Sequence, residues 1–401
     1  MISRPALSKR VLGMTPSATV ELAGRIESLK KQGVSVLSFS LGEPDFPTPE
    51  NICAAACSAI KEGHTKYTAA AGILELREAI CEKLRKDNGL EYAPNEITVT
   101  AGAKQALYNA LMAICDKGDE VIVPSPCWVS YVEMIKLAEA APVIVPTLEE
   151  EGFQLNMDTL KAALTPRTRA VLINSPNNPT GAVYGKETLL ALGKLAVEKG
   201  FYIITDEIYE KLIYDGEKHY SIGALCPECR EWCITVNGFS KAYSMTGWRV
   251  GYAAGPAAVI KGMNGLQGHM TSNASTPAQK ACVEALKGPQ DSVGVMREAF
   301  AERRGYILER LNAMPGIRCA DVKGAFYVMP NVSALYGKSY EGKRITDSLA
   351  LSELFIDQVQ VAVVPGVAFE APNNIRISYA SSMDAIREGM DRIERCLARL
   401  A

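Results

Sequence analysis

Six polar residues in the middle of the chain stand at or next to the ends of short apolar runs. The runs read RAVLI, FYIIT and CITVN, and the side chains beside them include an amide, a carboxylate, a phenol, an amine and a guanidinium. Ligands of open α/β sheets bind outside the carboxyl ends of the strands. We therefore expect these side chains to meet at one edge of a sheet. In chain order they are Asn178, Asp206, Tyr209, Ser240, Lys241 and Arg249.

This set of groups suits one cofactor, pyridoxal phosphate. The cofactor offers an aldehyde that forms a Schiff base with a lysine and a ring nitrogen that needs an anionic partner. Lys241 is the candidate lysine, and Asp206 is the candidate anion that keeps the ring nitrogen protonated. The remaining candidates are Asn178 and Tyr209 for the ring oxygen, and Arg249 and Ser240 for the phosphate.

The elements that must position these residues alternate between helix and strand. Amphipathic patterns predict helices over residues 50–62, 73–86 and 103–115, and an apolar run predicts a strand over 96–100. Six further strand-like runs follow, bounded by Pro, Gly, Asn or Asp, with a helical pattern at 186–199. Strands that are apolar on both faces and alternate with helices indicate a mostly parallel sheet that is covered on both sides.

The pattern of the sequence changes near residue 290. Long charged helices, predicted at 296–311, 347–358 and 384–400, frame the short runs GAFYVMP, VAVVPG and NIRISYA. We predict an α/β protein with a large cofactor-binding domain over residues 49–288, built on a mostly parallel sheet flanked by helices. The N-terminal segment 1–48 and residues 289–401 are predicted to form a smaller α+β domain.

The composition points to a soluble protein and by itself says nothing about its chemistry. The chain has 43 Lys and Arg against 45 Asp and Glu, a formal net charge of −2, which argues against nucleic acid as a partner. No run approaches the ~18 apolar residues of a membrane span. The first residues, MISRPALSKRVLGM, lack the apolar core of a signal peptide. We expect a cytoplasmic protein with no membrane partner.

Other uses of a parallel sheet lack their required residues. Gly337-Lys338-Ser339 looks like the end of a phosphate-binding loop, but Val332 stands where that loop needs its first glycine. No G-x-G-x-x-G follows a strand near the start of the sheet, and G-x-S-x-G is absent. The sequence therefore disfavours a nucleotide hydrolase, a dehydrogenase and an esterase.

One group of cysteines raises the possibility of a metal site. Cys226, Cys229 and Cys233, with His219 upstream, offer four ligands of the kind that bind zinc. However, Cys233 opens an apolar run, and His219 lacks the spacing of a zinc finger. The chain has eleven cysteines, an odd number, and only three histidines. We expect no metal, and we interpret the cysteines as reduced packing residues.

The motifs together resemble those of class I pyridoxal-phosphate aminotransferases of fold type I, in particular the bacterial aspartate aminotransferase subgroup. The resemblance spans essentially the whole chain, through SATVEL, LGEPDF, KYTAAAGILELREAI, SPNNPTG, DEIYE, SKAYSMTGWRVGY and NIRISYA. It implies a homodimer with the active site at the subunit interface. It also implies that Lys241 carries the cofactor, that Asp206 meets the ring nitrogen and that Trp128 stacks on the ring.

The resemblance assigns further residues to the substrate and to the neighbouring subunit. Arg376 of NIRISYA matches the arginine that grips the substrate α-carboxylate bidentately. Gly42 of LGEPDF lies against the substrate, beside Trp128 and Asn178. Tyr67 matches the tyrosine that reaches the phosphate of the neighbouring subunit.

Gly102, Ala103 and Lys104 begin the helix that follows the strand 96–100, so its first N–H groups are placed to receive the phosphate. Lysine in a first helical turn opposes the helix dipole, and such disfavoured choices occur where function overrides stability. Lys104 matches a lysine that meets the side-chain carboxylate of dicarboxylic substrates; the alternative is a solvated lysine without a role. We therefore predict that the protein transfers an amino group from an amino acid, L-aspartate, to a 2-oxo acid, 2-oxoglutarate, by a ping-pong mechanism.

Several alternatives stay open at this stage. Taken singly, Asp206 could be a helix cap, and Trp128 could be a core residue. An aromatic or prephenate aminotransferase and a carbon–sulfur lyase use the same fold, and a cofactor-binding regulator is a non-enzymatic alternative. Two positions depart from the family pattern. Gly238 stands where many relatives have a phosphate-binding serine, and Thr15 replaces a lysine found in some relatives that also aminate prephenate.

Overall fold

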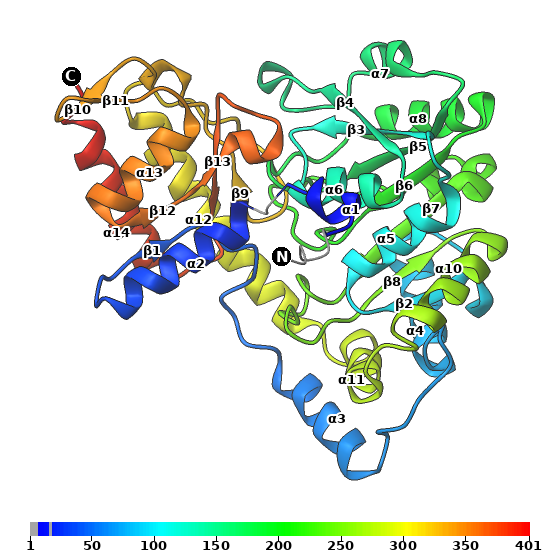
Figure 1. The fold of residues 1–401 in the computed structure, drawn as a ribbon. Coiled ribbons are helices and arrows are strands. Elements are labelled where there is room, and N and C mark those ends of the chain that lie inside the picture. Colours follow the sequence, from blue (N-terminus) through cyan, green and yellow to red (C-terminus); the bar gives the residue numbers. More distant parts are fainter. Residues whose placement is uncertain (1–6, 16–17) are drawn as a thin grey trace, which may run out of the picture.

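The computed structural model describes residues 7–15 and 18–401. Residues 1–6 and 16–17, which include part of the SATVEL motif and of the predicted smaller domain, lie outside the described residues. Two groups of elements lie side by side (Figure 1). A large sheet with its helices forms one group, drawn mainly in cyan and green. The second group combines α2 (Ala18–Lys31), in blue, with the last helices, in orange and red, whereas the short helix α1 (Lys9–Leu12), also in blue, lies beside α6 (Val129–Leu137) of the first group.

A seven-stranded sheet forms the centre of the first group, in the order β2-β8-β7-β6-β5-β3-β4. β8 runs antiparallel to β2 and β7, and all other neighbours are parallel. The predicted mostly parallel α/β sheet is confirmed. Its strands are β2 (Ile97–Thr100), β3 (Glu120–Ser125), β4 (Ala141–Pro146), β5 (Thr168–Asn174), β6 (Tyr202–Asp206), β7 (Cys233–Gly238) and β8 (Gly251–Ala254).

Helices cover both faces of this sheet, which explains why its strands are apolar throughout. In β5, Leu172 packs with α5 and α6, while Val171 and Ile173 pack with α8 on the opposite face. Successive side chains of a strand point to opposite faces, so both faces need apolar residues. The helices of this group are α3 (Glu50–Lys61), α4 (Leu74–Lys83), α5 (Ala103–Ile114), α6 (Val129–Leu137), α7 (Met157–Ala163), α8 (Lys186–Lys199), α9 (Ile222–Leu225), α10 (Ala257–Met270) and α11 (Thr276–Lys287).

The second group joins the two ends of the chain. β1 pairs in parallel with β12, and β13, β14 and β9 form a three-stranded antiparallel sheet. We keep the division at residues 48/49 and 288/289 as an inference from this grouping. The elements of these two ends are α1 (Lys9–Leu12), α2 (Ala18–Lys31), α12 (Asp291–Ala313), α13 (Ser348–Val359), α14 (Met383–Leu397), β1 (Leu37–Ser38), β9 (Tyr327–Val328), β10 (Ser339–Tyr340), β11 (Lys343–Arg344), β12 (Val361–Ala362), β13 (Val364–Pro365) and β14 (Ile375–Ser378).

The helix predicted at 73–86 differs from the structure at its end. α4 stops at Lys83, and a π-helical turn over Leu84–Asn88 follows it. Gly89 ends that turn with φ +67°, a conformation that glycine adopts without a steric penalty. The turn buries Asn88 behind β6, where the side chain meets two carboxylates that follow this strand. Among the described residues, no helix has the length and apolar character that crossing a membrane requires.

Candidate active site

A cavity of about 460 Å³ lies where β5, β6 and β7 end, between the two groups of elements. Two predicted site residues do not line it: Gly102 lies directly behind Arg249, and Tyr67 is 89% exposed on the surface. The predicted residues that line the cavity are Gly42, Ala103, Lys104, Trp128, Asn178, Asp206, Tyr209, Ser240, Lys241, Arg249 and Arg376. The strand ends thus bring together side chains that are far apart in the sequence.

Lys241 extends into the cavity and donates a hydrogen bond to the carbonyl oxygen of Gly42. Burial, together with the nearby cations Arg249 and Arg376, lowers the pKa of the ammonium to about 8, against the opposing charges of Glu43 and Asp206. The rings of Tyr209 and Phe326 lie 5.9 and 5.8 Å from the nitrogen. Lys241 is therefore a lysine that can give up its proton near neutral pH.

Asp206 is the last residue of β6 and is 4% exposed. Its Oδ2 accepts a hydrogen bond of 2.7 Å from Tyr131 Oη, and its Oδ1 accepts one of 3.2 Å from the backbone N–H of Ile208. Burial raises the pKa of the carboxyl to about 6, although these two donors favour the ionised form. The charge of the neighbouring Glu207 contributes to this rise in pKa, and the charge of Lys241 opposes it. A cation placed against Asp206 would favour its ionisation.

Arg376, on β14, is 2% exposed and has an incomplete set of partners. Nη1 donates to Asn178 Oδ1 at 3.0 Å, and Nη2 donates to the carbonyl oxygen of Ser40 at 2.6 Å. The guanidinium lies 4.6 Å from the ring centroid of Tyr327 and 4.9 Å from that of Phe369. Its Nε has no hydrogen-bond partner. Burial lowers the pKa of Arg376, so a bound carboxylate would relieve an unbalanced buried charge.

Tyr209 and Tyr327 form a pair of phenols at the bottom of the site, with their oxygens 3.0 Å apart. Burial and this contact raise the pKa of Tyr209 well above its ordinary value, so the phenol stays protonated. Gly42 is required beside the pair because a Cβ at this position would lie 2.6 Å from Tyr327 Oη. The absence of a side chain at Gly42 therefore leaves room for the phenol of Tyr327.

The amino end of α5 forms the most positive part of the cavity. Gly102 caps the helix with φ +80°, and a Cβ on it would lie 2.3 Å from Arg249 Nη2. Gly251 is equally constrained, since its Cβ would lie 2.3 Å from the backbone nitrogen of Ala103. Arg249 itself has φ +56° and donates to the carbonyl oxygen of Thr246 at 2.8 Å. Exposed N–H groups and a guanidinium at one helix terminus suit a phosphate.

Lys104 lies over the ring of Trp128, with its nitrogen 4.6 Å from the ring centroid. Partial burial lowers the pKa of Lys104, and the charge of Arg249 lowers it further. Trp128 precedes α6 and packs edge-on against Tyr131, with ring centroids 5.3 Å apart. Lys104 is thus a cation that lines the cavity and contacts the ring face of Trp128.

Sequence reasoning missed several residues of the site. Tyr131 stands three positions after Trp128, on the same helical face, and a tyrosine there is also a normal core residue. Tyr327 lies inside the apolar run GAFYVMP, where alternation could have indicated its inward orientation. Ser40 contributes only a carbonyl oxygen, which has no signal in the sequence.

The candidate metal ligands and the two positions that depart from the family pattern lie outside any metal site or catalytic contact described above. Cys226, Cys229 and Cys233 are buried in the apolar cluster beside α8, whereas His219 binds Glu207. Gly238, which departs from the family pattern, has no room for a side chain: its Cβ would lie 3.0 Å from the Cα of Gly251. Thr15, the second departure, is exposed, and its backbone N–H donates to Glu133 at 3.3 Å.

Comparisons with known proteins agree with this geometry. Residues 34–393 match the family model described as aminotransferase class I and II. An aspartate aminotransferase of Geobacillus stearothermophilus is 47% identical over 97% of this chain and 98% of its own. An aspartate/prephenate aminotransferase of Thermus thermophilus is 47% identical over 98% and 99%. The solved structure of aspartate aminotransferase from Thermus thermophilus with maleate superposes with a TM-score of 0.93, at 46% identity, and covers 98% of this chain and 100% of that one.

The chain belongs to the class I and II aminotransferases. The resemblance drawn from the motifs and the fold class drawn from the alternating elements are both confirmed. The protein is accordingly an enzyme that transfers amino groups between amino acids and 2-oxo acids.

Proposed function

We propose that the protein transfers the amino group of L-aspartate to 2-oxoglutarate with pyridoxal phosphate as its cofactor. The observation that carries this proposal is the charge of the cavity. Four cationic residues line it, and among the described lining residues Asp206 is the one acid. The excess of positive charge requires anionic ligands, and a phosphate together with a dicarboxylic substrate supplies them. The four cationic residues are Lys104, Lys241, Arg249 and Arg376.

The residues present fit pyridoxal phosphate. When bound, this cofactor supplies an aldehyde for amino groups and a protonated ring that withdraws electrons from the substrate Cα. Asp206, with its pKa raised by burial, awaits a cationic partner such as the ring nitrogen. The glycine at position 102 leaves Arg249 and the first N–H groups of α5 accessible to a phosphate. Trp128 is the aromatic residue suited to stacking on the ring, and Asn178 and Tyr209 offer donors to the ring oxygen.

Lys241 has the properties of the acid–base group of this reaction. A pKa of about 8 lets the amine both accept and return a proton near neutral pH. The proton it moves is the one on the substrate Cα. The carbonyl oxygen of Gly42, which accepts from the ammonium, holds Lys241 in the cavity, where the cofactor aldehyde would meet it. Tyr209 stays protonated and therefore acts as a hydrogen-bond donor.

Two cations suit the two carboxylates of the substrate. Arg376 presents a planar guanidinium, which matches an α-carboxylate bidentately. Lys104 provides a point charge on a flexible stem for the distal carboxylate. The names of the relatives support this assignment. The similar Thermus thermophilus structure supports it as well, because it was solved with maleate, which is a dicarboxylate.

The test is product analysis with purified protein and pyridoxal phosphate. Aspartate plus 2-oxoglutarate should give oxaloacetate and glutamate, with a visible absorption band that changes on adding either partner alone, as a ping-pong reaction requires. Release of a thiol from a sulfur-containing amino acid without a 2-oxo acid would instead identify a lyase. Because several relatives are named for prephenate as well, prephenate serves as a second acceptor. We expect it to react more weakly, since Thr15 replaces a lysine.

The predicted homodimer belongs to the same proposal. Tyr67 is 89% exposed, and Ile60, Leu74 and Met270 expose between 51% and 54% of their area. A second subunit covering these side chains would remove apolar area from water and would bring Tyr67 to the phosphate of the neighbouring site. Sedimentation should give the mass of two chains, and a monomer with full activity would contradict the proposal.

A further inference from the structure

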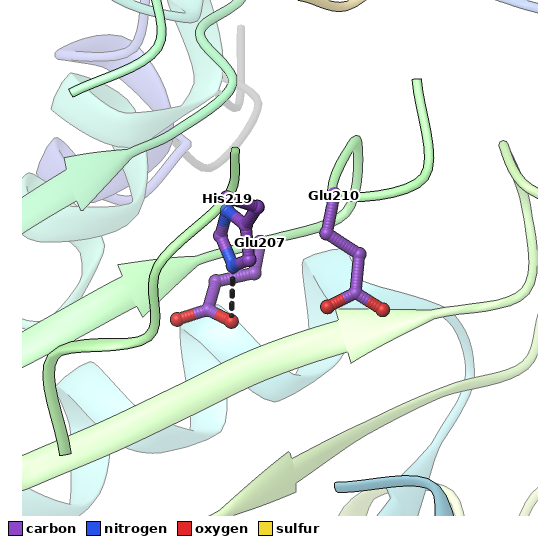
Figure 2. A group of neighbouring side chains, drawn as sticks. All are labelled: Glu207, Glu210 and His219. Carbon is purple, nitrogen blue, oxygen red and sulfur yellow. Dashed lines mark hydrogen bonds and ion pairs between the residues drawn. The ribbon is translucent and has the colours of Figure 1, made fainter. Parts of the chain in front are cut away.

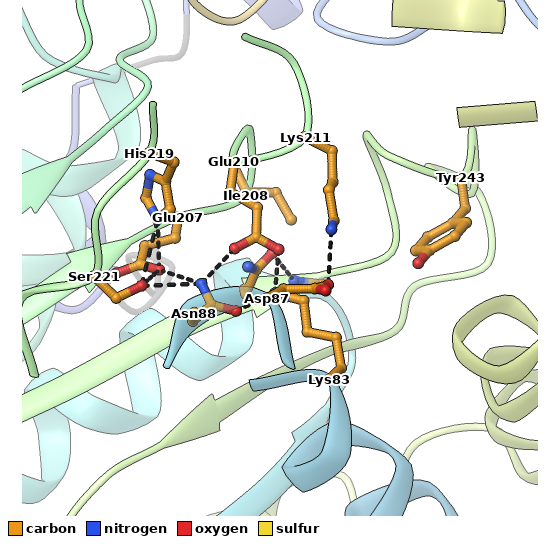
Figure 3. Close-up of polar contacts among 12 residues, drawn as sticks. Lys83, Asp87, Asn88, Glu207, Ile208, Glu210, Lys211, His219, Ser221 and Tyr243 are labelled. Atoms are coloured by element: carbon orange, nitrogen blue, oxygen red, sulfur yellow. Dashed lines mark hydrogen bonds and ion pairs between the residues drawn. The ribbon is translucent and has the colours of Figure 1, made fainter. Parts of the chain in front are cut away.

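A group of charged residues with largely buried side chains surrounds Glu207 and Glu210 (Figure 3). These two residues belong to the turn that also carries Asp206 and Tyr209. Within this turn, Asp206 and Tyr209 line the cavity, whereas Glu207 and Glu210 lie on the other side and bind Asn88 of the π-helical turn. We call Lys83, Asn88, Glu207, Glu210, His219 and Ser221 the charge network. The proposed reaction uses none of these residues, and yet two of them, Glu207 and Glu210, belong to the same five-residue turn, 206–210, as the site residues.

Glu207 is fully buried and surrounded by donors. Its Oε2 accepts from Ser221 Oγ at 2.7 Å, from His219 Nε2 at 2.9 Å and from Asn88 Nδ2 at 3.3 Å. Its Oε1 accepts from Thr205 Oγ1 at 3.2 Å. Four side-chain donors thus converge on the one carboxylate that lies directly beside Asp206 in the chain.

Glu210 has a positive partner of its own. Lys83, at the end of α4, forms an ion pair with Glu210 Oε1 and donates to Asn88 Oδ1 at 2.7 Å. Asn88 Nδ2 donates to Glu210 Oε2 at 2.7 Å. Burial opposes the ionisation of Glu210, but Lys83 outweighs burial, with help from His219, and lowers the pKa to about 2. Glu210 and Lys83 thus cancel each other's charge.

The balance of charge then depends on His219. With a neutral imidazole the charge network has a net charge of −1, and with an imidazolium it is neutral. An unbalanced charge is unfavourable at a buried site. Burial and the charge of Lys83 lower the pKa of His219, but Glu207 and Glu210 outweigh them and raise it above its ordinary value. The nearby Asp87 is paired with Lys211 at 2.7 Å, and the pKa of Cys233, next to Glu207, is raised by burial to about 12, so neither adds a net charge.

We propose that His219 is held as an imidazolium and acts as a positioning residue for Asp206. Its charge neutralises Glu207, which would otherwise oppose the ionisation of Asp206, and its hydrogen bond holds the turn from behind. The second part of this role rests on the proposed function, in which Asp206 must be ionised to meet the ring nitrogen of the cofactor.

The spacing of three of these residues also resembles that of a metal site (Figure 2). Ligand atoms of Glu207, Glu210 and His219 lie within 4.8 Å of one another. However, the ammonium of Lys83 already binds the Glu210 carboxylate, and it would repel a second cation. The positive charges that balance the two carboxylates are therefore those of Lys83 and His219.

The charge of His219 is measured by histidine NMR on the wild-type protein. The chain has three histidines, and His64 and His269 are exposed, so selective ¹⁵N labelling gives three ring signals that single His→Gln variants assign. We expect His219 to titrate at higher pH than the other two. Glu207→Gln removes the carboxylate that favours the imidazolium. In this variant the His219 signal should therefore titrate at a lower pH than the signals of His64 and His269. A wild-type His219 that titrates at or below the exposed histidines would overturn the proposal.

The effect on the cofactor is measured as the affinity for pyridoxal phosphate. Glutamine at position 219 keeps a donor for Glu207 but removes the charge, so His219→Gln should weaken binding by up to ~10-fold at pH 5.5, below the Asp206 pKa of about 6, the equivalent of one pKa unit at Asp206, and by less than ~2-fold at pH 7.5. The double variant Glu207→Gln/His219→Gln is again neutral and should recover most of this loss. A purely structural histidine predicts no recovery. Arg399→Gln, which removes an exposed ion pair with Glu341, is the matched control and should leave the affinity unchanged.

These two measurements fail in different ways. A wild-type protein that binds no pyridoxal phosphate would overturn the proposed function, and with it the role toward Asp206, while the NMR titration still decides the charge of His219. A wild-type protein that binds the cofactor, with equal losses in the single and double variants, would overturn the role of His219 alone.

Discussion

The turn 206–210 has two sides, one that faces the cavity and one that faces the charge network. The pKa shifts favour neutral groups on the cavity side and charged groups on the network side. On the cavity face, burial raises the pKa of Asp206 to about 6 and lowers that of Lys241 to about 8, so both groups are shifted toward neutrality. In the charge network, the pKa of Glu210 falls to about 2 and that of His219 rises, so both shifts favour the charged forms. The difference comes from the charged partners that surround the groups on each face.

This contrast separates residues that await a ligand from residues that hold the structure. The network carries two negative and two positive charges in direct contact. The cavity gathers four cations around one acid. An excess of one sign of charge at such a site indicates a position where function overrides stability. Variants that change one face at a time can test this separation.

Removal of the cavity amine should have the largest effect. Lys241→Ala deletes the proposed acid–base group and the attachment point of the cofactor, so we expect turnover to fall by more than ~10⁴-fold. The visible absorption band should change to that of loosely held pyridoxal phosphate. Steady-state assays and absorption spectra test this. Transamination by Lys241→Ala at near the wild-type rate would remove the basis of the proposed mechanism.

Breaking the charge network should act on stability. Lys83→Met keeps most of the side-chain volume but leaves Glu210 buried without its cation, a loss of ~3–5 kcal/mol in the free energy of unfolding. Urea unfolding of the wild type and the variant measures it. The matched control is Lys211→Met, which breaks the more exposed pair with Asp87 and should cost ~0–1 kcal/mol. Equal losses in both variants would mean that the network is no more stabilising than a surface pair.

The sequence predicts much of the cavity face, because chemistry and location coincide there. Asp206 and Lys241 are polar residues at the ends of apolar strands, and that position alone predicts where they lie. The sheet itself follows from runs such as RAVLI, which are apolar on both faces. Arg376 and Gly42 are predicted only by the resemblance to a family, since neither stands in a local pattern that indicates a ligand.

The charge network could not be predicted in the same way. Lys83 falls within a pattern that predicts an ordinary amphipathic helix through residue 86, and nothing in it indicates the π-helical turn that buries Asn88. His219 lies in a polar loop, and the sequence raises Cys226, Cys229 and Cys233 as its partners only in a metal site that it then disfavours. Its true partner, Glu207, is twelve residues earlier and across the turn. Contacts between side chains of distant elements depend on packing, which periodicity does not encode.

Loss of the distal cation should change specificity within the cavity. Lys104→Ala removes the proposed partner of the side-chain carboxylate, so kcat/KM for aspartate should fall by ~10–100-fold, the range of a hydrogen bond to a charged group. Activity with an apolar or aromatic amino acid should change little. The ratio of the two values of kcat/KM is the measurement. An equal loss for both substrates would show that Lys104 serves the phosphate or the fold instead.

The smallest effect should reveal the unfavourable charge in the cavity itself. In the cofactor-free protein the pKa of Lys241 is about 8, below its ordinary value of 10.5. Between these values the unfolded chain binds more protons than the folded one, so the stability of the wild type should rise as the pH rises from about 8 to 10. Lys241→Met removes the buried charge, so it should stabilise the cofactor-free protein at pH 7 by ~1–2 kcal/mol and remove the alkaline rise. Urea unfolding at pH 7, 8, 9 and 10 measures both. A destabilised Lys241→Met would mean that the cavity face, like the charge network, already balances its charges without a ligand.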